Sequence, residues 1–347
     1  MTDTPIKSAT DAMALAEAAL ADYLQAQVPG FRGPLTATKF KGGQSNPTYR
    51  IDAASGTCVL RRKPPGALLP SAHAVDREFR VLQALHGSAA PVARPLHLCT
   101  DESVIGSMFY LMAFVDGRIH WDPSLPGMTH DERGAIYGGI IDAMAAVHTI
   151  DPTAVGLADF GKPGNYFERQ LRRWTEQFHA SQTRPIPAMD ALIAALPARC
   201  PADDGTVALV HGDFRIDNLM FDPAQPKVIA IVDWELSTLG HPLADLGYFC
   251  MALRLPRNPA LPGLAGLDRS ALGIPHESAL LARYSELTGR PIPSDWPFVL
   301  AFSFFRLAAI AQGVAKRAEQ GNASSDQAVQ AGRMTEMLAQ LGVEVLG

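Results

Sequence analysis

The most constraining feature of the sequence is a polar segment held between two short apolar runs. The first run, at 207–210, is followed by His211, Gly212 and Asp213. Asn218 comes five residues after Asp213. After a turn, a second apolar run at 228–232 delivers Asp233 at its end. Aliphatic and β-branched residues dominate both runs, which predicts two strands whose ends carry these three polar side chains.

This set of side chains suits phosphoryl transfer. That reaction needs a carboxylate to orient the attacking hydroxyl and accept its proton, and it needs oxygen ligands to hold Mg²⁺ on the phosphates. A single Asp or Asn in a loop more often caps a turn. The spacing of Asp213 and Asn218, with Asp233 on the following strand, favours the chemical interpretation over the capping one.

The chain of 347 residues is long enough for two lobes. Periodicity and turn signals predict an α+β, bilobal fold: a small, β-rich N-terminal lobe at 1–115 and a larger, mostly helical C-terminal lobe at 116–347. An N-terminal helix is expected at 10–27. The other elements expected in the first lobe are strands at 35–40, 48–51, 57–61, 94–98 and 108–115, and a helix at 74–85. Helices expected in the second lobe lie at 131–148, 166–178 and 189–196.

Composition argues against several classes of function. The formal net charge is −5, and no block of Lys and Arg suggests a nucleic acid or an anionic membrane as partner. The four cysteines are widely scattered, which favours free thiols over a metal site or disulfides. The apolar stretch at 299–314 is too short and too mixed to span a bilayer. We expect a cytoplasmic protein, and the sequence does not predict its oligomeric state.

The segment His211-Gly212-Asp213 through Asn218, followed by Asp233-Trp234-Glu235, resembles the aminoglycoside phosphotransferase/choline kinase family, whose fold is protein-kinase-like. Within that family the chain is most similar to the phosphotransferase modules associated with acyl-CoA dehydrogenases. The residues that carry this closer similarity lie at 61–66, 69–73 and 76–78.

The resemblance implies roles for individual residues. Asp213 would be the catalytic base, and Asn218 and Asp233 would bind Mg²⁺, with ATP as co-substrate. His211 would be a scaffold residue of the loop. Asp245 would be a buried carboxylate that binds the loop backbone and does no chemistry.

A Gly-rich hairpin is expected to cover the phosphates. Gly42, Gly43 and Ser45 lie between two predicted strands, and glycine lets backbone N–H groups approach phosphate oxygens closely. Alone this pattern is often only a turn. A GxxxxGK[ST] motif is absent, which argues against the P-loop class.

Arg61 is predicted to take the place of the strand-borne cation that contacts the α- and β-phosphates. Its expected partner is Glu78 on the following helix, because a guanidinium can bridge a phosphate and a carboxylate. Lys63, on the same face, is the alternative phosphate contact, and a solvated surface pair is the alternative role of Arg61 and Glu78. The backbone of Ala113 and Val115, where the lobes join, is expected to contact the adenine.

The expected function is transfer of the γ-phosphate of ATP to a hydroxyl of a small molecule. The closer similarity suggests a hydroxyacyl or hydroxyacyl-CoA-type acceptor. The alternatives are an aminoglycoside or amino-alcohol kinase, a catalytically silent nucleotide-binding pseudokinase and a metallohydrolase. The choice of ATP or GTP and the role of Glu235 stay open. Trp296, Phe302, Phe305 and Arg306 are interpreted as core residues, with an acceptor-binding wall as the alternative.

Overall fold

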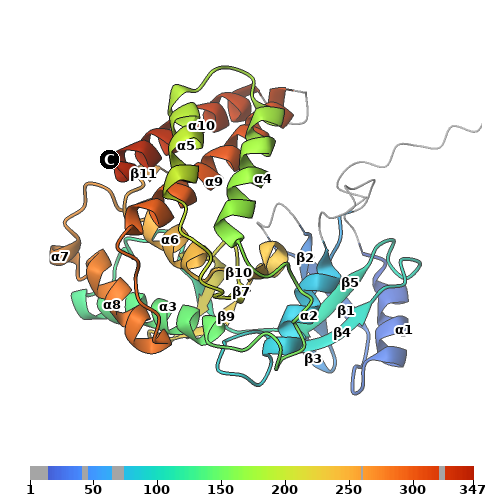
Figure 1. Ribbon diagram of the computed structural model, residues 1–347. Coiled ribbons are helices and arrows are strands. Elements are labelled where there is room, and N and C mark those ends of the chain that lie inside the picture. The colour runs from blue at the N-terminus through green and yellow to red at the C-terminus, as the bar shows by residue number, and fades with distance from the viewer. Residues whose placement is uncertain (1–14, 41–45, 65–73, 259–260, 320–324) are drawn as a thin grey trace, which may run out of the picture. The chain divides into compact units, whose positions relative to one another are not determined.

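The computed structural model describes residues 15–40, 46–64, 74–258, 261–319 and 325–347 (Figure 1). The chain forms two compact units. The first unit runs through Arg118 and also contains Met220–Pro223 and Ile229–Glu235, and the second unit contains the rest. The first boundary therefore falls three residues after the predicted one at 115. The two late segments that return to the first unit include Asp233.

The first unit is built on a five-stranded antiparallel sheet with the order β1-β2-β3-β5-β4. The second and third strands are joined by a two-residue turn, which suits an antiparallel pair. Gly56 begins the third strand directly after this turn with a φ of 118°, a conformation that favours glycine. The strands are β1 (Leu35–Lys39), β2 (Thr48–Ala53), β3 (Gly56–Arg62), β4 (Pro95–Cys99) and β5 (Phe109–Ala113).

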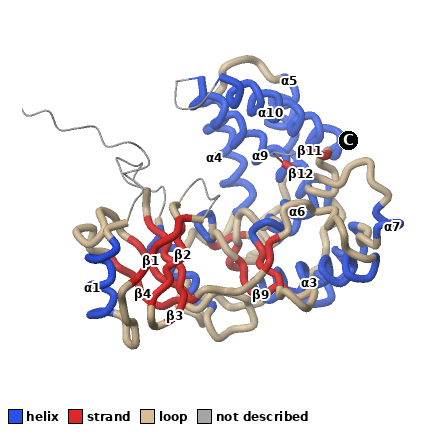
Figure 2. The backbone as a smooth tube through the Cα atoms, turned by 180° about the vertical axis from the view of Figure 1, so that it is seen from behind, coloured by secondary structure: helices blue, strands red, loops and turns tan. Residues whose placement is uncertain are grey.

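Two helices accompany this sheet. Helix α2 (Val75–Leu85) packs against β4 and β5 through apolar residues at helical spacing, among them Phe79 and Leu82 (Figure 1). Helix α1 (Glu17–Gln27) lies beside β1, as Figure 2 shows from behind. The sequence predicts a helix from residue 10. That prediction is wrong for residues 15 and 16, which are not helical, and residues 10–14 lie outside the described residues.

The start of α1 is tied to the sheet. The carboxylate of Glu17 accepts a hydrogen bond from the Ala37 N–H at 2.8 Å. Leu20 and Leu24 of the helix are fully buried against Ile51, Leu60 and the rest of this core. The first unit therefore has a hydrophobic core of its own, which holds β3 and its C-terminal Arg61 in a fixed position.

The second unit is mostly helical. Helices α4, α5, α9 and α10 pack side by side, and α9 also contacts α6, while α3 packs against α8 (Figure 1). The helices are α3 (His130–His148), α4 (Tyr166–Ser181), α5 (Pro187–Arg199), α6 (Leu243–Met251), α7 (Arg269–Leu272), α8 (Glu277–Thr288), α9 (Trp296–Arg317) and α10 (Ser325–Leu346).

Short strands position the polar loops. β7 (Ala208–Val210) pairs with β10 (Thr238–Gly240), and β11 (Arg257–Asn258) pairs with β12 (Leu261–Pro262). A further three-stranded sheet has the order β6-β8-β9. Its strands are β6 (Arg118–Ile119), β8 (Leu219–Phe221) and β9 (Val228–Ile231). The strands predicted at 207–210 and 228–232 are β7 and β9.

Helix α9 is longer than the apolar stretch recognised in the sequence. Its 22 residues and a mean hydropathy of 1.8 satisfy the length and composition of a membrane span, but 83% of that apolar window is buried within the protein. Phe302 and Phe305 are almost completely buried, which confirms their interpretation as core residues. α9 is the central core helix of the second unit.

Candidate active site

The loop that follows β7 brings Asp213 and Asn218 together. The Asn218 side-chain Nδ2 donates to the backbone carbonyl and to Oδ2 of Asp213, both at 2.9 Å. A short 3₁₀ turn (Ile216–Asn218) sets this spacing. Because the amide nitrogen faces Asp213, the Asn218 oxygen remains for a cation, which fits the oxygen ligands that Mg²⁺ prefers. The Asp213 side chain is 24% exposed and can be reached by a substrate.

Gly212 explains why the loop begins with His-Gly-Asp. Its φ is 86°, and a Cβ there would lie 2.6 Å from the Leu236 carbonyl oxygen. A side chain is therefore disfavoured both by conformation and by space. The buried His211 accepts the Asp213 N–H on Nδ1 at 3.2 Å, so its place in the structure is that of a scaffold residue.

Asp245 of α6 binds the backbone of the loop that contains Asp213. Its two carboxylate oxygens accept the N–H groups of His211 at 2.6 Å and of Gly212 at 2.8 Å, and His148 lies 3.2 Å from Oδ2. Burial opposes its ionisation, yet the hydrogen bond with His148 and the loop N–H groups hold the pKa of Asp245 below its ordinary value of 3.8. The contact predicted between Asp245 and the loop backbone is confirmed.

Arg306, from a segment much later in the sequence, also binds the loop that contains Asp213. This α9 residue is buried, it donates to the Gly212 carbonyl oxygen through Nη2, and its guanidinium lies over the rings of Trp174 and Tyr248. It anchors the loop from His211 to Asn218. The contact spans 94 residues of sequence, so local pattern could not have revealed it.

Two further residues next to Asp213 were missed in the sequence. Burial, and after it the charge of the Asp213 carboxylate, raises the pKa of the Tyr248 hydroxyl well above 10. Arg215 Nε lies 3.6 Å from Asp213 Oδ1, and its Nη2 binds Asp217 at 2.8 Å. A signal for Arg215 was present, since a cation two residues after the proposed base is placed to contact an anionic substrate.

In the first unit, Arg61 and Glu78 form the predicted pair. Arg61 Nε lies 2.9 Å from Glu78 Oε2, and Nη2 lies 2.5 Å from Asp233 Oδ1 and 3.9 Å from Glu235 Oε2. Burial alone would lower the pKa of Arg61, but the surrounding carboxylates raise it above its ordinary value. The structure thus gathers Arg61, Glu78, Asp233 and Glu235 into one cluster, which we call the Arg61 cluster.

Glu78 is the most buried carboxylate of the Arg61 cluster. Burial, the largest influence, together with Asp233 and Glu235 raises the pKa of Glu78 to about 7, although Arg61 acts in the opposite direction. Asn46 donates to Glu78 Oε1 at 2.7 Å and to Glu235 Oε2 at 3.4 Å, and the Tyr110 hydroxyl donates to Glu78 Oε2 at 3.2 Å. Neither Asn46 nor Tyr110 had been recognised in the sequence.

Asp233 follows β9 in an unusual conformation. Its φ is 68°, in the left-handed region that non-glycine residues rarely adopt. Such strain gathers at functional sites. Arg61 binds one of its carboxylate oxygens, Oδ1, and the second can bind a metal. Asp233 lies in the first unit, and Asp213 and Asn218 lie in the second.

The remaining predicted residues belong to the hairpin and the hinge. Gly42, Gly43 and Ser45 lie outside the described residues. The Ala113 N–H donates to the Arg94 carbonyl oxygen at 2.8 Å and is therefore engaged by the protein itself, and the adenine contact of Ala113 stays a prediction. Val115 is the second residue after β5, and Arg50 lies over the ring of the intervening Phe114 at 4.9 Å.

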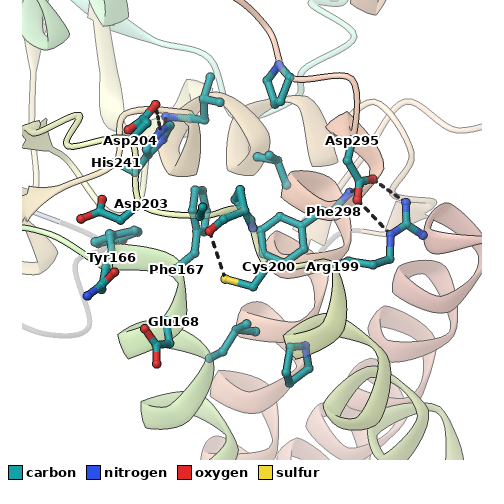
Figure 3. A pocket seen from close by; sticks show the side chains of 18 of the residues that line it. Tyr166, Phe167, Glu168, Arg199, Cys200, Asp203, Asp204, His241, Asp295 and Phe298 are labelled. Atoms are coloured by element: carbon teal, nitrogen blue, oxygen red, sulfur yellow. Dashed lines mark hydrogen bonds and ion pairs between the residues drawn. The ribbon is translucent and has the colours of Figure 1, made fainter.

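The second unit contains two cavities that matter for the acceptor. The larger, which we call the helical cavity, has a volume of about 960 Å³ and lies between α4, the end of α5, the segment 200–206 and the start of α9 (Figure 3). Arg199 and Asp295 form an ion pair in its wall, and His241 Nε2 lies 3.7 Å from Asp204 Oδ2. Its lining includes no residue of the loop from His211 to Asn218.

The smaller cavity, which we call the loop cavity, has a volume of about 300 Å³. Residues 214–217 of the loop that contains Asp213 form part of its wall. Its lining residues are Trp121, Pro123, Tyr137, Phe214, Arg215, Ile216, Asp217, Tyr248, Phe249, Met251, Ala252, Leu253, Leu255, Leu261 and Pro262.

Comparison with protein families gives one match across most of the chain. The model described as "Phosphotransferase enzyme family" matches residues 36–280. Among curated proteins, the mouse acyl-CoA dehydrogenase family member 10 is 47% identical over 331 residues. That alignment covers 95% of this chain but 31% of the mouse protein, so the chain spans about a third of the length of this relative.

Comparison with solved structures gives the same fold. A crystal structure from Ralstonia eutropha, provisionally named an aminoglycoside phosphotransferase, is 49% identical with a TM-score of 0.88, over 96% of this chain and 98% of that one. A mutant of the aminoglycoside phosphotransferase APH(4)-Ia, in complex with AMP-PNP and hygromycin B, is 16% identical with a TM-score of 0.60, over 93% and 99% of the chains. The α+β fold with a sheet in its N-terminal region and a helical C-terminal region is therefore the fold of protein-kinase-like phosphotransferases.

Proposed function

Because this chain belongs to the phosphotransferase enzyme family, we propose that it is an ATP-dependent kinase that phosphorylates a hydroxyl group of a small molecule. The observation that carries the proposal is the loop around Asp213. Asp245 and Arg306 fix its backbone, and Asn218 orients the Asp213 carboxylate. A base held in one geometry before the substrate arrives is what positioning catalysis requires.

The reaction follows from the chemistry of these groups. The Asp213 carboxylate accepts a hydrogen bond from the acceptor hydroxyl and takes its proton as the oxygen attacks the γ-phosphorus, while ADP leaves on the opposite side. The bond from the γ-phosphorus to the β,γ-bridging oxygen breaks as the new ester bond forms. Asn218 and Asp233 would hold Mg²⁺, which when bound neutralises charge on the phosphates.

Arg61 would bind the nucleotide. Its guanidinium is fixed by Glu78 on one side, so its second edge is preorganised for an anionic partner. In the structure that partner is Asp233. Phosphate oxygens would compete for the same edge of the guanidinium, which would release the Asp233 carboxylate to bind the metal ion.

The acceptor we propose is a hydroxyacyl compound or its CoA thioester. The support is the mouse relative, whose name places it among acyl-CoA dehydrogenases and which contains a region 47% identical to this chain. An enzyme that joins the two activities would act on related acyl substrates. The second candidate is an aminoglycoside or amino alcohol, favoured by the hygromycin B complex of the more distant structure.

The test is a measurement of ADP release from Mg·ATP over three sets of acceptors: hydroxyacyl-CoA thioesters, amino alcohols and aminoglycosides. We expect Asp213→Asn to lower kcat roughly a hundred- to ten-thousandfold while ATP binding is retained, because only the base is lost. The matched control is Asp131→Asn, whose side chain is fully exposed at the start of α3 and should leave kcat unchanged. Normal turnover by Asp213→Asn contradicts the proposal. Nucleotide binding without ADP release across all three sets favours a pseudokinase.

A further inference from the structure

The wall of the loop cavity includes the segment that follows the proposed base. Phe214 to Asp217, the four residues after Asp213, form part of this wall. Tyr248, another wall residue, lies under the guanidinium of Arg306, which donates to the Gly212 carbonyl oxygen of the same loop. A molecule bound in this cavity therefore contacts the segment that directly follows the proposed base. Its volume of about 300 Å³ lies at the small end of the range of ligand sites, roughly 300–1,000 Å³.

The walls of the loop cavity are apolar, with one exception. Arg215 and Asp217 are the charged lining residues, and they bind each other at 2.8 Å, so the pair adds no net charge. The hydroxyl of Tyr137 is engaged with the Pro123 carbonyl oxygen at 2.7 Å. A polycation would need several carboxylates that are not already paired, whereas a hydrocarbon chain needs walls of this kind.

The edge of the cavity carries an exposed aromatic side chain. Trp121 is 65% exposed, the highest exposure among the large hydrophobic residues that the structure describes as exposed. An indole left in water beside an apolar cavity is typical of a surface that a ligand covers.

The far wall of the cavity is fixed by close backbone packing. The N–H groups of Leu264 and Ala265 donate to the carbonyl oxygens of Ala252 and Leu255 at 3.1 and 3.0 Å. A Cβ on Gly263 would lie 2.0 Å from the Leu255 oxygen, so only glycine allows this approach. The cavity is thus formed in advance, which limits the entropy lost when a flexible chain binds.

We propose that the loop cavity binds the hydrocarbon chain of the acceptor and places its hydroxyl at Asp213. This inference rests on the proposed kinase function and adds to it the location of the chain. The helical cavity, three times larger, has the Arg199–Asp295 ion pair in its wall and no residue of the loop from His211 to Asn218. Chain length, and not positive charge, then determines which acceptors are phosphorylated efficiently.

The first experiment measures kcat and KM for hydroxyalkanoyl-CoA thioesters that differ only in chain length. Each methylene buried in the cavity should lower KM roughly fourfold until the cavity is full. Ala252→Leu adds bulk to the wall in a helical conformation that leucine tolerates, and it should raise KM for the longer acceptors roughly tenfold. The matched control is Ala202→Leu, the same change in the lining of the helical cavity, with no expected effect.

The second experiment measures binding without turnover, using saturated acyl-CoA thioesters that have no hydroxyl to phosphorylate. Binding should change tryptophan fluorescence with an affinity that rises with chain length, and Trp121→Phe should remove most of that change. This assay gives a result even if no acceptor is phosphorylated, so it separates the chain site from the proposed function. Affinity that is independent of chain length, or a larger effect of Ala202→Leu than of Ala252→Leu, overturns the inference.

Discussion

The two aspartates expected to carry the chemistry are held in opposite ways. Asp233 is held by charge: a single guanidinium, that of Arg61, links it to Glu78 and Glu235. Asp213 is held by its backbone: Asp245 and Arg306 bind the loop on which it stands, and the neutral Asn218 amide donates to its carboxylate, while Arg215 Nε lies 3.6 Å away. The charged partner of Asp233 can be exchanged for a ligand. The loop beneath Asp213 cannot move without breaking buried hydrogen bonds.

The difference matches what each residue would have to do. A metal ligand such as Asp233 has to leave its partner, the Arg61 guanidinium, when Mg·ATP binds. An ion pair suits this role, because phosphate oxygens can take the place of the carboxylate on the guanidinium. A base has to keep its orientation through every turnover, so its support should not depend on the substrate. The predictions below test this contrast in order of decreasing effect.

The largest effect is expected from Asp245→Asn. The amide keeps one acceptor oxygen but directs an N–H₂ group at a backbone N–H, which leaves a buried donor unsatisfied. We expect the free energy of unfolding in urea to fall by about 3 kcal/mol. Loss of stability without any change in kcat would contradict the view that Asp245 positions Asp213.

Asp245 also gives the wild-type protein a defined acid sensitivity. Its folded pKa is lowered, so its stabilising contribution is complete above its ordinary pKa of 3.8 and is lost as the pH falls below that value through the folded pKa. Urea unfolding measured at decreasing pH should show this loss in the wild type. The Asp245→Asn protein should lack that part of the pH dependence.

An intermediate effect is expected from Arg61→Lys. A lysine ammonium cannot present the two edges with which Arg61 contacts Glu78 and Asp233 together. We expect KM for ATP to rise about tenfold, equivalent to about 1.4 kcal/mol, with a smaller change in kcat. The comparison variant is Lys63→Ala. A larger rise in KM for ATP in Lys63→Ala would assign the phosphate contact to Lys63.

The smallest effect is expected from Asp142→Asn. Asp142 forms a pair with Arg283 at 2.7 Å, but both side chains are almost half exposed. Exposed pairs contribute little because water competes for both charges. The free energy of unfolding should change by less than about 1 kcal/mol, and the difference should shrink in high salt. A change as large as that of Asp245→Asn would show that burial does not explain the contrast between the two regions.

Much of the chemistry was readable because it is local in sequence. Asp213 and Asn218 are five residues apart, and one turn of the chain places their side chains in contact. The pairing of Arg61 with Glu78 followed from the resemblance to the kinase-like family, and the structure has that pair. Helices α2, α3 and α4 lie close to their predicted positions, since each has an apolar stripe or a clear start.

The residues that sequence reasoning missed make contacts between distant segments. Asn46 reaches Glu235 across 189 residues, and Arg306 reaches Gly212 across 94. No periodicity encodes such contacts, because they depend on how whole elements pack. The loop cavity was missed for the same reason: its walls come from α3, α6, the catalytic loop and β12, which meet only in the folded chain.

The first unit is discontinuous in sequence, and this limits how the protein can be divided. A fragment that ends at Arg118 lacks Ile229–Glu235, and with it the carboxylates of Asp233 and Glu235 that neutralise Arg61. Its buried guanidinium would face Glu78 alone. Neither unit is thus a module that recombination could exchange independently.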